Sequence, residues 1–327
     1  MKILITGGVG FIGLHLTKHL LQNEDNEITL ADNFFRGEKD KELEEILKND
    51  RVTLIELDLT NKDEYEKLGN GYDYIYHLAA VNGTKYFYEM PEEVLRINIL
   101  SLIYILEWMR SENKEGKLLF TSSNEAYAGA IEAFGKLPIP TPENVPLVIS
   151  DVYNPRWSYA GTKLIGEQFV IHYAEKYKLK AVIVRPHNFF GQRAGFSHVI
   201  PEFALRIADK KDPFEIFGTE ETRTFCYIED AVEAMKLLME SKNTDTHPIE
   251  TVHIGGEEEI TMEGLAEKMF ESAGWRPNKI EKKEAPKGSV KRRKADITKI
   301  KKLVGWTPKT ALKEGLKKTY DWYALRS

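Results

Sequence analysis

The chain has 327 residues, of which 42% are apolar and 30% charged, and this composition excludes a wholly disordered chain. Its 46 basic and 51 acidic residues give a net charge of −5, which offers no reason to expect nucleic acid or an anionic membrane as a partner. The single cysteine, Cys226, excludes an internal disulfide and a cysteine-based zinc site, and this usage is typical of the reducing cytoplasm. The longest apolar stretch, 97–109, is too short to span a bilayer, and we expect neither a membrane segment nor a signal peptide.

Short apolar runs alternate with helical patterns from the first residues onward. Strands are predicted at 2–6, 27–31, 52–57, 74–78, 117–122 and 180–184. Helices are predicted at 14–21, 91–110 and 159–177. Apolar strands without alternation, separated by helices, indicate a parallel sheet covered on both faces, which is a doubly wound α/β fold.

The pattern becomes irregular after about residue 188, and no linker rich in glycine and serine marks a boundary. We expect a dinucleotide-binding domain over residues 1–187, to which 225–255 returns, and a smaller, mixed substrate domain over 188–224 and 256–327. Within the latter, 281–302 holds ten Lys or Arg and three Asp or Glu. This segment is interpreted as a solvated surface on which one or two arginines could face a phosphate.

A glycine-rich turn follows the first predicted strand. Residues 6–13 read Thr-Gly-Gly-Val-Gly-Phe-Ile-Gly and fit both GxxGxxG and GxGxxG. Side chains at these glycines would block the tight turn, the approach of a pyrophosphate or the packing of helix on strand. The helix that follows offers free N–H groups and its positive dipole end, so the turn predicts a dinucleotide site.

Two carboxylates follow the next predicted strands. Asp32, 19 residues after Gly13, would accept hydrogen bonds from the adenosine ribose and repel a 2′-phosphate, which favours NAD over NADP. Arg36 lies close by and could offset that preference. Asp58 is placed to contact the adenine edge. The alternative is that it is only a turn residue at the end of a strand.

Tyr159 and Lys163 are spaced i, i+4 and share one helix face. A free tyrosine has a pKa near 10, and a nearby ammonium would lower that pKa and make the phenol a usable base. Ser123 follows a predicted strand, where its hydroxyl could hydrogen-bond the reacting oxygen. Each feature alone is common, but their combination with the glycine turn and Asp32, in this order, is specific.

In these motifs the chain resembles the extended short-chain dehydrogenase/reductases, and among them the NAD-dependent nucleotide-sugar epimerases and dehydratases. The resemblance covers essentially the whole chain, from TGGVGFIG to ADITKIKKLVGWTPKT. The matching stretches are 6–13, 32–33, 58–59, 77–80, Asn98, 121–127, 159–163, 185–191, 223–234 and 295–310.

The resemblance implies a Rossmann domain, bound NAD and a nucleotide-diphosphate sugar as substrate. In it Tyr159 takes the proton of the sugar C4 hydroxyl, Ser123 orients that oxygen, and Lys163 tunes Tyr159 and holds the nicotinamide ribose. The implied cofactor-binding residues are Gly7, Gly10, Phe11, Ile12, Asp32, Asn33, Asp58, Leu59, Leu78, Ala79, Ala80, Asn98, Tyr159 and Lys163. The implied substrate-binding residues are Thr84, Lys85, Asn124, Asn188, His198, Arg223 and Arg293.

The reaction branches at the 4-keto sugar, and the residues after Ser123 bear on the branch. Dehydratases of the family carry Asp-Glu there, whereas this chain has Asn124-Glu125, and an amide cannot act as the acid. Glu125 is more than a 4-epimerase needs and matches the family's decarboxylases. Two further stretches of this chain resemble those decarboxylases. They are Asn154-Pro155-Arg156, and Arg293 with the Lys-Ala-Asp that follows it.

Our first expectation is nevertheless an NAD-dependent nucleotide-sugar 4-epimerase, with Glu125 as a fourth catalytic residue. The alternatives are decarboxylation of a UDP-hexuronic acid, and 4,6-dehydration or simple dehydrogenation at C4. His187, which precedes Asn188, could line the site or pack at a strand end. The helices at 91–110 and 159–177 form a dimer interface in relatives, so we expect a homodimer in the cytoplasm.

Overall fold

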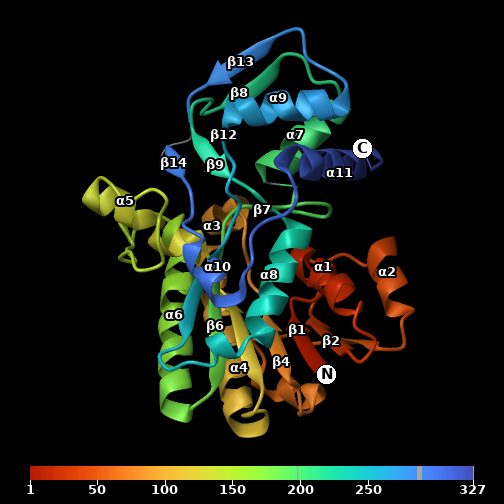
Figure 1. Cartoon of the computed structure of the whole chain (residues 1–327), viewed down its shortest axis with the longest axis vertical. Coiled ribbons are helices and arrows are strands. Elements are labelled where there is room, and N and C mark those ends of the chain that lie inside the picture. Colours follow the sequence, from red (N-terminus) through yellow and green to blue (C-terminus); the bar gives the residue numbers. More distant parts are fainter. Residues whose placement is uncertain (197, 286–288, 327) are drawn as a thin grey trace.

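The computed structural model describes residues 1–196, 198–285 and 289–326. A seven-stranded sheet, parallel throughout, forms the lower part of the molecule in Figure 1, with strands in the order β11-β6-β5-β4-β1-β2-β3. This confirms the doubly wound fold. The strands are β1 (Lys2–Thr6), β2 (Glu27–Asp32), β3 (Val52–Glu56), β4 (Tyr74–His77), β5 (Lys117–Thr121), β6 (Lys180–Pro186) and β11 (Glu250–Ile254).

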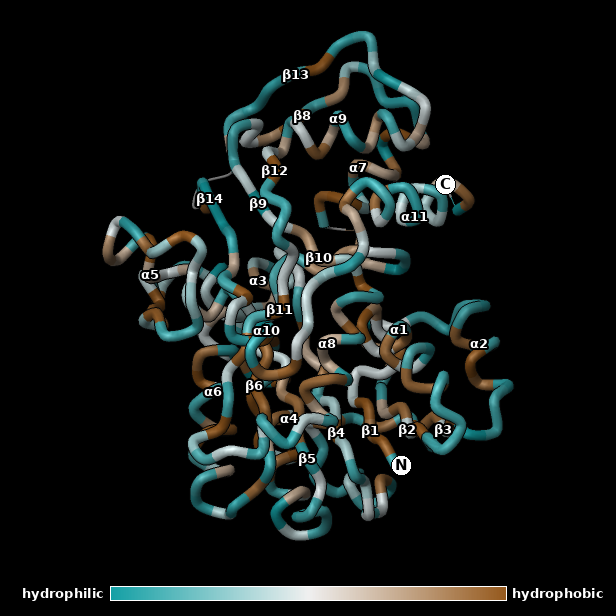
Figure 2. Tube along the Cα trace, viewed as in Figure 1, coloured by the Kyte–Doolittle hydropathy of each residue, from teal (hydrophilic) through white to brown (hydrophobic). Residues whose placement is uncertain are grey.

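Successive residues of β1 show why the sheet is covered on both sides. Ile3 and Ile5 pack into one apolar cluster and Leu4 into another, and all three are fully buried. The first cluster holds α1 (Phe11–Leu20) and α8 (Ile228–Glu240), which pack against each other. The second holds α4 (Pro91–Glu112) and α6 (Trp157–Tyr177), which also pair. Figure 2 shows the hydrophobic residues gathered along these inner strands.

The upper lobe in Figure 1 is built from segments that leave the sheet and come back. It contains α7 (Val199–Ala208), α9 (Met262–Ala273), α11 (Leu312–Ala324) and three short sheets. The strands of those sheets are β7 (Phe189–Phe190) with β10 (Cys226–Tyr227), β8 (Phe214–Phe217) with β13 (Ile280–Lys283), and β9 (Thr222–Thr224) between β12 (Glu259–Thr261) and β14 (Arg292–Arg293). The chain thus returns to the sheet at α8 and β11, although the proposed domain limits stay a prediction.

Short elements complete the described chain and carry much of the site. They are α2 (Lys41–Leu47), η1 (Lys62–Leu68), α3 (Thr84–Glu89), η2 (Asn124–Tyr127), α5 (Ala128–Phe134), η3 (Lys242–Thr244) and α10 (Thr298–Val304). Two predicted helices begin earlier than expected, α1 at Phe11 and α6 at Trp157. In the described part of the chain, no helix combines the length and apolar character needed to cross a membrane.

Candidate active site

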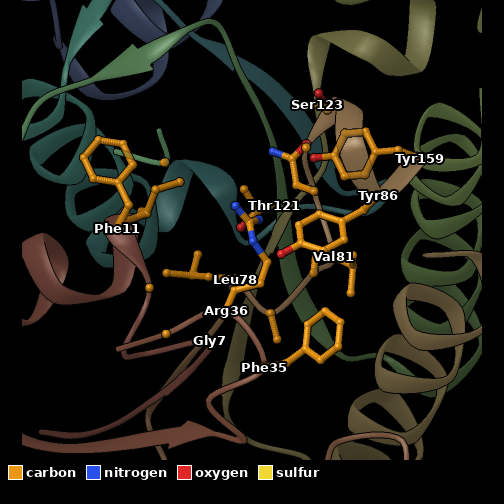
Figure 3. Close-up of a pocket in the computed structure, with 18 of the residues that line it drawn as sticks. Gly7, Phe11, Phe35, Arg36, Leu78, Val81, Tyr86, Thr121, Ser123 and Tyr159 are labelled. Atoms are coloured by element: carbon orange, nitrogen blue, oxygen red, sulfur yellow. The ribbon is translucent and has the colours of Figure 1, made fainter. Parts of the chain in front are cut away.

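A cavity of about 1310 Å³ lies where the strands of the large sheet end, and residues of the upper lobe also line it. Its walls include the glycine turn, the ends of β2 to β6, and residues of the upper lobe. Figure 3 shows Gly7 and Phe11 at one side of the cavity and Ser123 and Tyr159 at the other. The cavity therefore joins the predicted dinucleotide turn to the predicted catalytic residues.

The glycine turn is shaped so that backbone comes close to the cavity. Gly7 has φ +68, and a Cβ there would lie 2.8 Å from the backbone of Ala79. A Cβ at Gly13 would lie 2.6 Å from the carbonyl oxygen of Gly8. Gly10 is the N-cap of α1 and makes no side-chain cap, so the first N–H groups of the helix remain available to an anion. The residues present therefore fit the pyrophosphate of a dinucleotide.

Asp32 lies at the end of β2, as expected for a ribose ligand. Its Oδ2 accepts from the Val9 N–H at 3.1 Å and its Oδ1 from the Phe34 N–H at 2.9 Å, which fixes the carboxylate at the cavity wall. Burial raises the pKa of Asp32, and those backbone N–H groups oppose the rise. Asp58 lines the cavity too, while its Oδ1 also accepts from Thr60 N–H at 2.8 Å within its own turn.

Ser123 and Tyr159 meet at the far side of the cavity. Tyr159 lies in the first turn of α6 and its hydroxyl is hydrogen-bonded to the Ser123 side chain. The ring of Phe87 stacks on the ring of Tyr159 with 5.2 Å between centroids. Lys163, one turn further along α6, donates from Nζ to the Thr121 carbonyl oxygen at 2.7 Å, and Nζ lies 5.5 Å from the centre of the Tyr159 ring.

The expected lowering of the Tyr159 pKa is not found in the protein alone. Burial raises the pKa of Tyr159 above its usual range, and the hydrogen bond to Ser123 only partly opposes this. Burial also lowers the pKa of Lys163 to about 7, with Glu167 opposing the fall. Desolvation disfavours the charged form of both groups, and it outweighs the attraction between phenolate and ammonium on which the expectation rested.

Glu125 is held at the cavity by two arginines. Its Oε1 accepts from Arg293 Nη1 at 2.6 Å, and its Oε2 lies 3.7 Å from Arg156 Nη2. Burial raises the pKa of Glu125, but Arg293 and then Arg156 outweigh it and the pKa is lowered overall. Glu125 is therefore an ionised carboxylate at neutral pH, beside two cations that can bind an anion.

The implied substrate residues also line this cavity, although several already have partners. Asn188 donates from Nδ2 to the Thr224 carbonyl oxygen at 2.8 Å, and Arg223 donates from Nη2 to Glu221 at 3.0 Å. Burial, followed by Arg293, lowers the pKa of Arg223 to about 10. The cavity-lining members of the set are Thr84, Lys85, Asn124, Asn188, His198, Arg223 and Arg293.

One expected position, Asn98, and one that the sequence left open, His187, lie away from the cavity. Asn98 is buried behind its wall, where it accepts from the Val81 N–H at 2.7 Å and donates to the Val81 carbonyl at 3.2 Å. It therefore shapes the strand end beside the cofactor site and is not among the cavity-lining residues described. His187 is fully buried and packs edge-on against His253 at 4.7 Å between ring centres, which supports its structural interpretation.

Other residues of the site gave no clear signal in the sequence. Tyr86 and Phe87 on α3 and Arg193 after β7 line the cavity. Arg193 donates to Asp40 at 2.6 Å and to the Val9 carbonyl at 2.7 Å, so it joins the upper lobe to the glycine turn. Arg36, already noted beside Asp32 in the sequence, has its guanidinium carbon 5.7 Å from the centre of the Tyr86 ring. Figure 3 shows both side chains in the cavity. These contacts join distant segments, and no local pattern encodes them.

Comparisons with known proteins agree with this geometry. Residues 3–255 match the model of the NAD dependent epimerase/dehydratase family. The chain is 32% identical to a UDP-N-acetyl-alpha-D-glucosaminuronate decarboxylase of Bacillus cytotoxicus, over 98% of this chain and 97% of that protein. It is 33% identical to UDP-glucuronic acid decarboxylase 5 of Arabidopsis thaliana, over 100% of this chain and 90% of that protein.

A solved structure also matches the whole molecule. The UDP-glucuronic acid 4-epimerase of Bacillus cereus, in complex with UDP-glucuronic acid and NAD, superposes with a TM-score of 0.85 at 25% identity and covers 100% of both chains. The expected NAD dependence is thereby confirmed for the family, and the enzyme class with it. The matched family model, the full-length relatives and the cavity lead to one conclusion: the chain belongs to the NAD-dependent epimerase/dehydratase family.

Proposed function

We propose that the chain is an NAD-dependent decarboxylase of a UDP-hexuronic acid. The single observation that carries this proposal is the ion pair of Glu125 and Arg293, with 2.6 Å between Oε1 and Nη1, beside Ser123 in the cavity. It supplies an ionised carboxylate and a guanidinium where the resemblance implies the sugar C5 and C6. Two full-length relatives that are 32% and 33% identical are decarboxylases of such substrates.

Oxidation at C4 makes the loss of carbon dioxide possible. When bound, NAD supplies a reversible two-electron oxidation of the sugar at C4. The phenolate form of Tyr159, which the positive charge of an oxidised nicotinamide would stabilise, receives the proton of the C4 hydroxyl, and Ser123 donates a hydrogen bond to the same oxygen. The resulting ketone is β to the C6 carboxylate, so the electrons of the C5–C6 bond can move to the C4 oxygen as carbon dioxide leaves. Ser123 and Tyr159 are placed to stabilise that enolate, and C5 then takes up a proton. Return of the hydride to C4, with a proton passed from Tyr159 to the C4 oxygen, restores the C4 hydroxyl and gives the UDP-pentose with the cofactor oxidised again.

Glu125 and its arginines account for selectivity at C6. A guanidinium binds a carboxylate through two parallel hydrogen bonds, so Arg293 can exchange its contact with Glu125 for one with the substrate. The pKa of Glu125 is lowered by Arg293 and Arg156, so its carboxylate is available as a hydrogen-bond acceptor or base and is a poor acid. Asn124 offers an amide where dehydration needs an acid, which disfavours the dehydratase alternative.

Epimerisation at C4, our first expectation from the sequence, remains the second candidate. The observation in its favour is the match to the UDP-glucuronic acid 4-epimerase, whose TM-score of 0.85 extends over the whole of both chains. The same Ser123, Tyr159 and Lys163 would serve it, because both reactions pass through a 4-keto sugar. It leaves the ionised Glu125 without a chemical task, which is why we place it second.

The test is incubation of the protein with UDP-glucuronic acid, UDP-N-acetylglucosaminuronic acid and the corresponding UDP-hexoses, with products read by NMR and mass spectrometry. Decarboxylation gives a UDP-pentose lighter by the mass of carbon dioxide. A C4 epimer of unchanged mass would select the second candidate, and a product lighter by one water would indicate dehydration. A 4-keto product that retains the C6 carboxylate, together with reduced cofactor, would indicate a simple dehydrogenase.

We infer that the protein is a homodimer built on the outer faces of α4 and α6. The two helices pack side by side, and each exposes an aliphatic residue: Leu95 is 45% exposed and Ile165 39% exposed. Light scattering during gel filtration tests this inference. A Leu95→Glu/Ile165→Glu variant should shift a dimer toward monomer, whereas a wild-type monomer would contradict it.

A further inference from the structure

A buried ion pair lies directly behind the catalytic residues. Glu167, on α6, accepts from Arg185 of β6 through two hydrogen bonds, Nε to Oε1 at 2.8 Å and Nη2 to Oε2 at 2.7 Å. Both side chains are only 4% exposed. Two parallel charge-assisted bonds fix the Glu167 carboxylate in place and compensate its charge in a site from which water is excluded.

Glu167 is connected to the catalytic segment through one hydroxyl. Ser122 donates from Oγ to Glu167 Oε1 at 2.5 Å, and its own backbone N–H donates to the Val184 carbonyl at 2.8 Å. Ser122 stands between Thr121, whose carbonyl accepts from Lys163, and Ser123. Any displacement of Ser122 would therefore move both the acceptor of Lys163 and the Ser123 hydroxyl.

We propose that Glu167 is a positioning residue for the reaction: through Ser122 it fixes the 121–123 segment, and from the next turn of α6 its carboxylate favours the ammonium form of Lys163 beside Tyr159. Arg185 supports this arrangement by binding the Glu167 carboxylate. Neither Glu167 nor Arg185 is among the cavity-lining residues described, so both act on the reaction through Ser122 and Lys163.

The groups around Lys163 show why a negatively charged side chain is needed there. Tyr159 and Glu167 face it from α6 and His77 from β4, while Arg185 of β6 lies behind Glu167. Burial lowers the pKa of His77 to about 3, so that ring is neutral at physiological pH. Burial lowers the pKa of Lys163 to about 7, and Glu167 is the group that opposes this fall.

Two variants separate the two parts of the proposal. Ser122→Ala cuts the link to the 121–123 segment but keeps the Glu167–Arg185 pair, and it should lower kcat about tenfold with little change in KM. Glu167→Gln removes the negative charge, and it should move the titration of Lys163 to lower pH by about one unit. The titration is followed by NMR of ¹³Cε-labelled lysine, with the Lys163 signal assigned from a Lys163→Met variant.

Glu175→Gln, two turns further along α6 at a half-buried position, is the matched control and should change neither kcat nor the Lys163 titration. If Glu167→Gln does not fold, Glu167→Gln/Arg185→Gln, which leaves no unpaired buried charge, takes its place. Wild-type kcat in Ser122→Ala, or a Lys163 titration at the wild-type pH without Glu167, would overturn the proposal.

The kinetic arm, measured with UDP-glucuronic acid, rests on the proposed function, whereas the lysine titration needs no nucleotide sugar. A wild-type protein that does not turn over UDP-glucuronic acid would therefore count against the proposed function. The titration would still decide whether Glu167 controls the charge of Lys163.

Discussion

Arg293 of β14 reaches Glu125 of η2 across 168 residues of chain, with 2.6 Å between Nη1 and Oε1. The contact joins the last strand of the upper lobe to the segment that follows β5 of the large sheet. Its position beside Ser123 brings a fixed pair of opposite charges to the Ser123–Tyr159 end of the cavity. The reaction branch proposed for this protein depends on that pair.

Replacing Glu125 by Gln tests the role of the pair. The variant leaves the Arg293 guanidinium without its carboxylate, so a hexuronate substrate should bind more tightly while the step that needs Glu125 slows. We expect kcat for decarboxylation to fall about 100-fold with a lower KM. Glu132→Gln, at a nearby exposed position, is the control. An unchanged kcat would remove Glu125 from the chemistry.

Tyr159→Phe tests the proposed acid–base residue. Loss of the hydroxyl should lower turnover about 1000-fold. Among the described residues, Ser123 is the only other hydroxyl that is hydrogen-bonded at the Tyr159 hydroxyl. NAD affinity, measured by calorimetry, should remain close to that of the wild type. Tyr153→Phe, at a side chain 93% exposed, serves as the matched control. Retained turnover in Tyr159→Phe would show that another group moves the proton.

Gly13→Ala tests the fit of the dinucleotide turn. The added Cβ would lie 2.6 Å from the Gly8 carbonyl oxygen, so the turn must shift away from its present shape. We expect NAD affinity to fall at least about 100-fold. Gly69→Ala is the control: its φ of +65 costs about 1 kcal/mol of stability, but its Cβ meets nothing within 4 Å and NAD affinity should not change. Equal NAD affinity in both variants would contradict the fit.

Buried histidines predict a loss of stability in mild acid. Burial lowers the pKa of His77 and of His253 to about 3, so between roughly pH 6.5 and 3 the unfolded chain binds protons that the folded chain does not. Their contribution is therefore fully present above pH 6.5 and is lost as pH falls, by about 1.4 kcal/mol per pH unit for each ring.

Urea unfolding at pH 7.5, 6.5 and 5.5 measures this dependence. His253→Phe keeps a ring against Tyr127 and His187 but cannot titrate, so its stability should fall less steeply with acid than that of the wild type. His172→Gln, at an exposed position on α6, should keep the wild-type slope. Parallel slopes for His253→Phe and the wild type would show that His253 is not held neutral.

Local patterns predict those parts of the site that lie within one element. The glycine turn and the Tyr159–Lys163 pair each depend on a spacing of a few residues, and the structure brings both to the cavity. The contact of Arg293 with Glu125 depends on tertiary folding, so local spacing cannot predict it. The family resemblance pointed to each of the two residues but not to their contact. Asn98 is the opposite case. The family resemblance predicted that it binds the cofactor, but a motif does not show on which side of the cavity wall a side chain lies.

The most direct test of the central claim is the reaction of the wild-type protein with UDP-glucuronic acid in D2O, followed by NMR and mass spectrometry. The proposed decarboxylation releases carbon dioxide and gives a UDP-pentose that carries one deuterium at C5 and keeps the original hydrogen at C4. UDP-galacturonic acid without deuterium, or unchanged substrate in a protein that binds NAD, would contradict it.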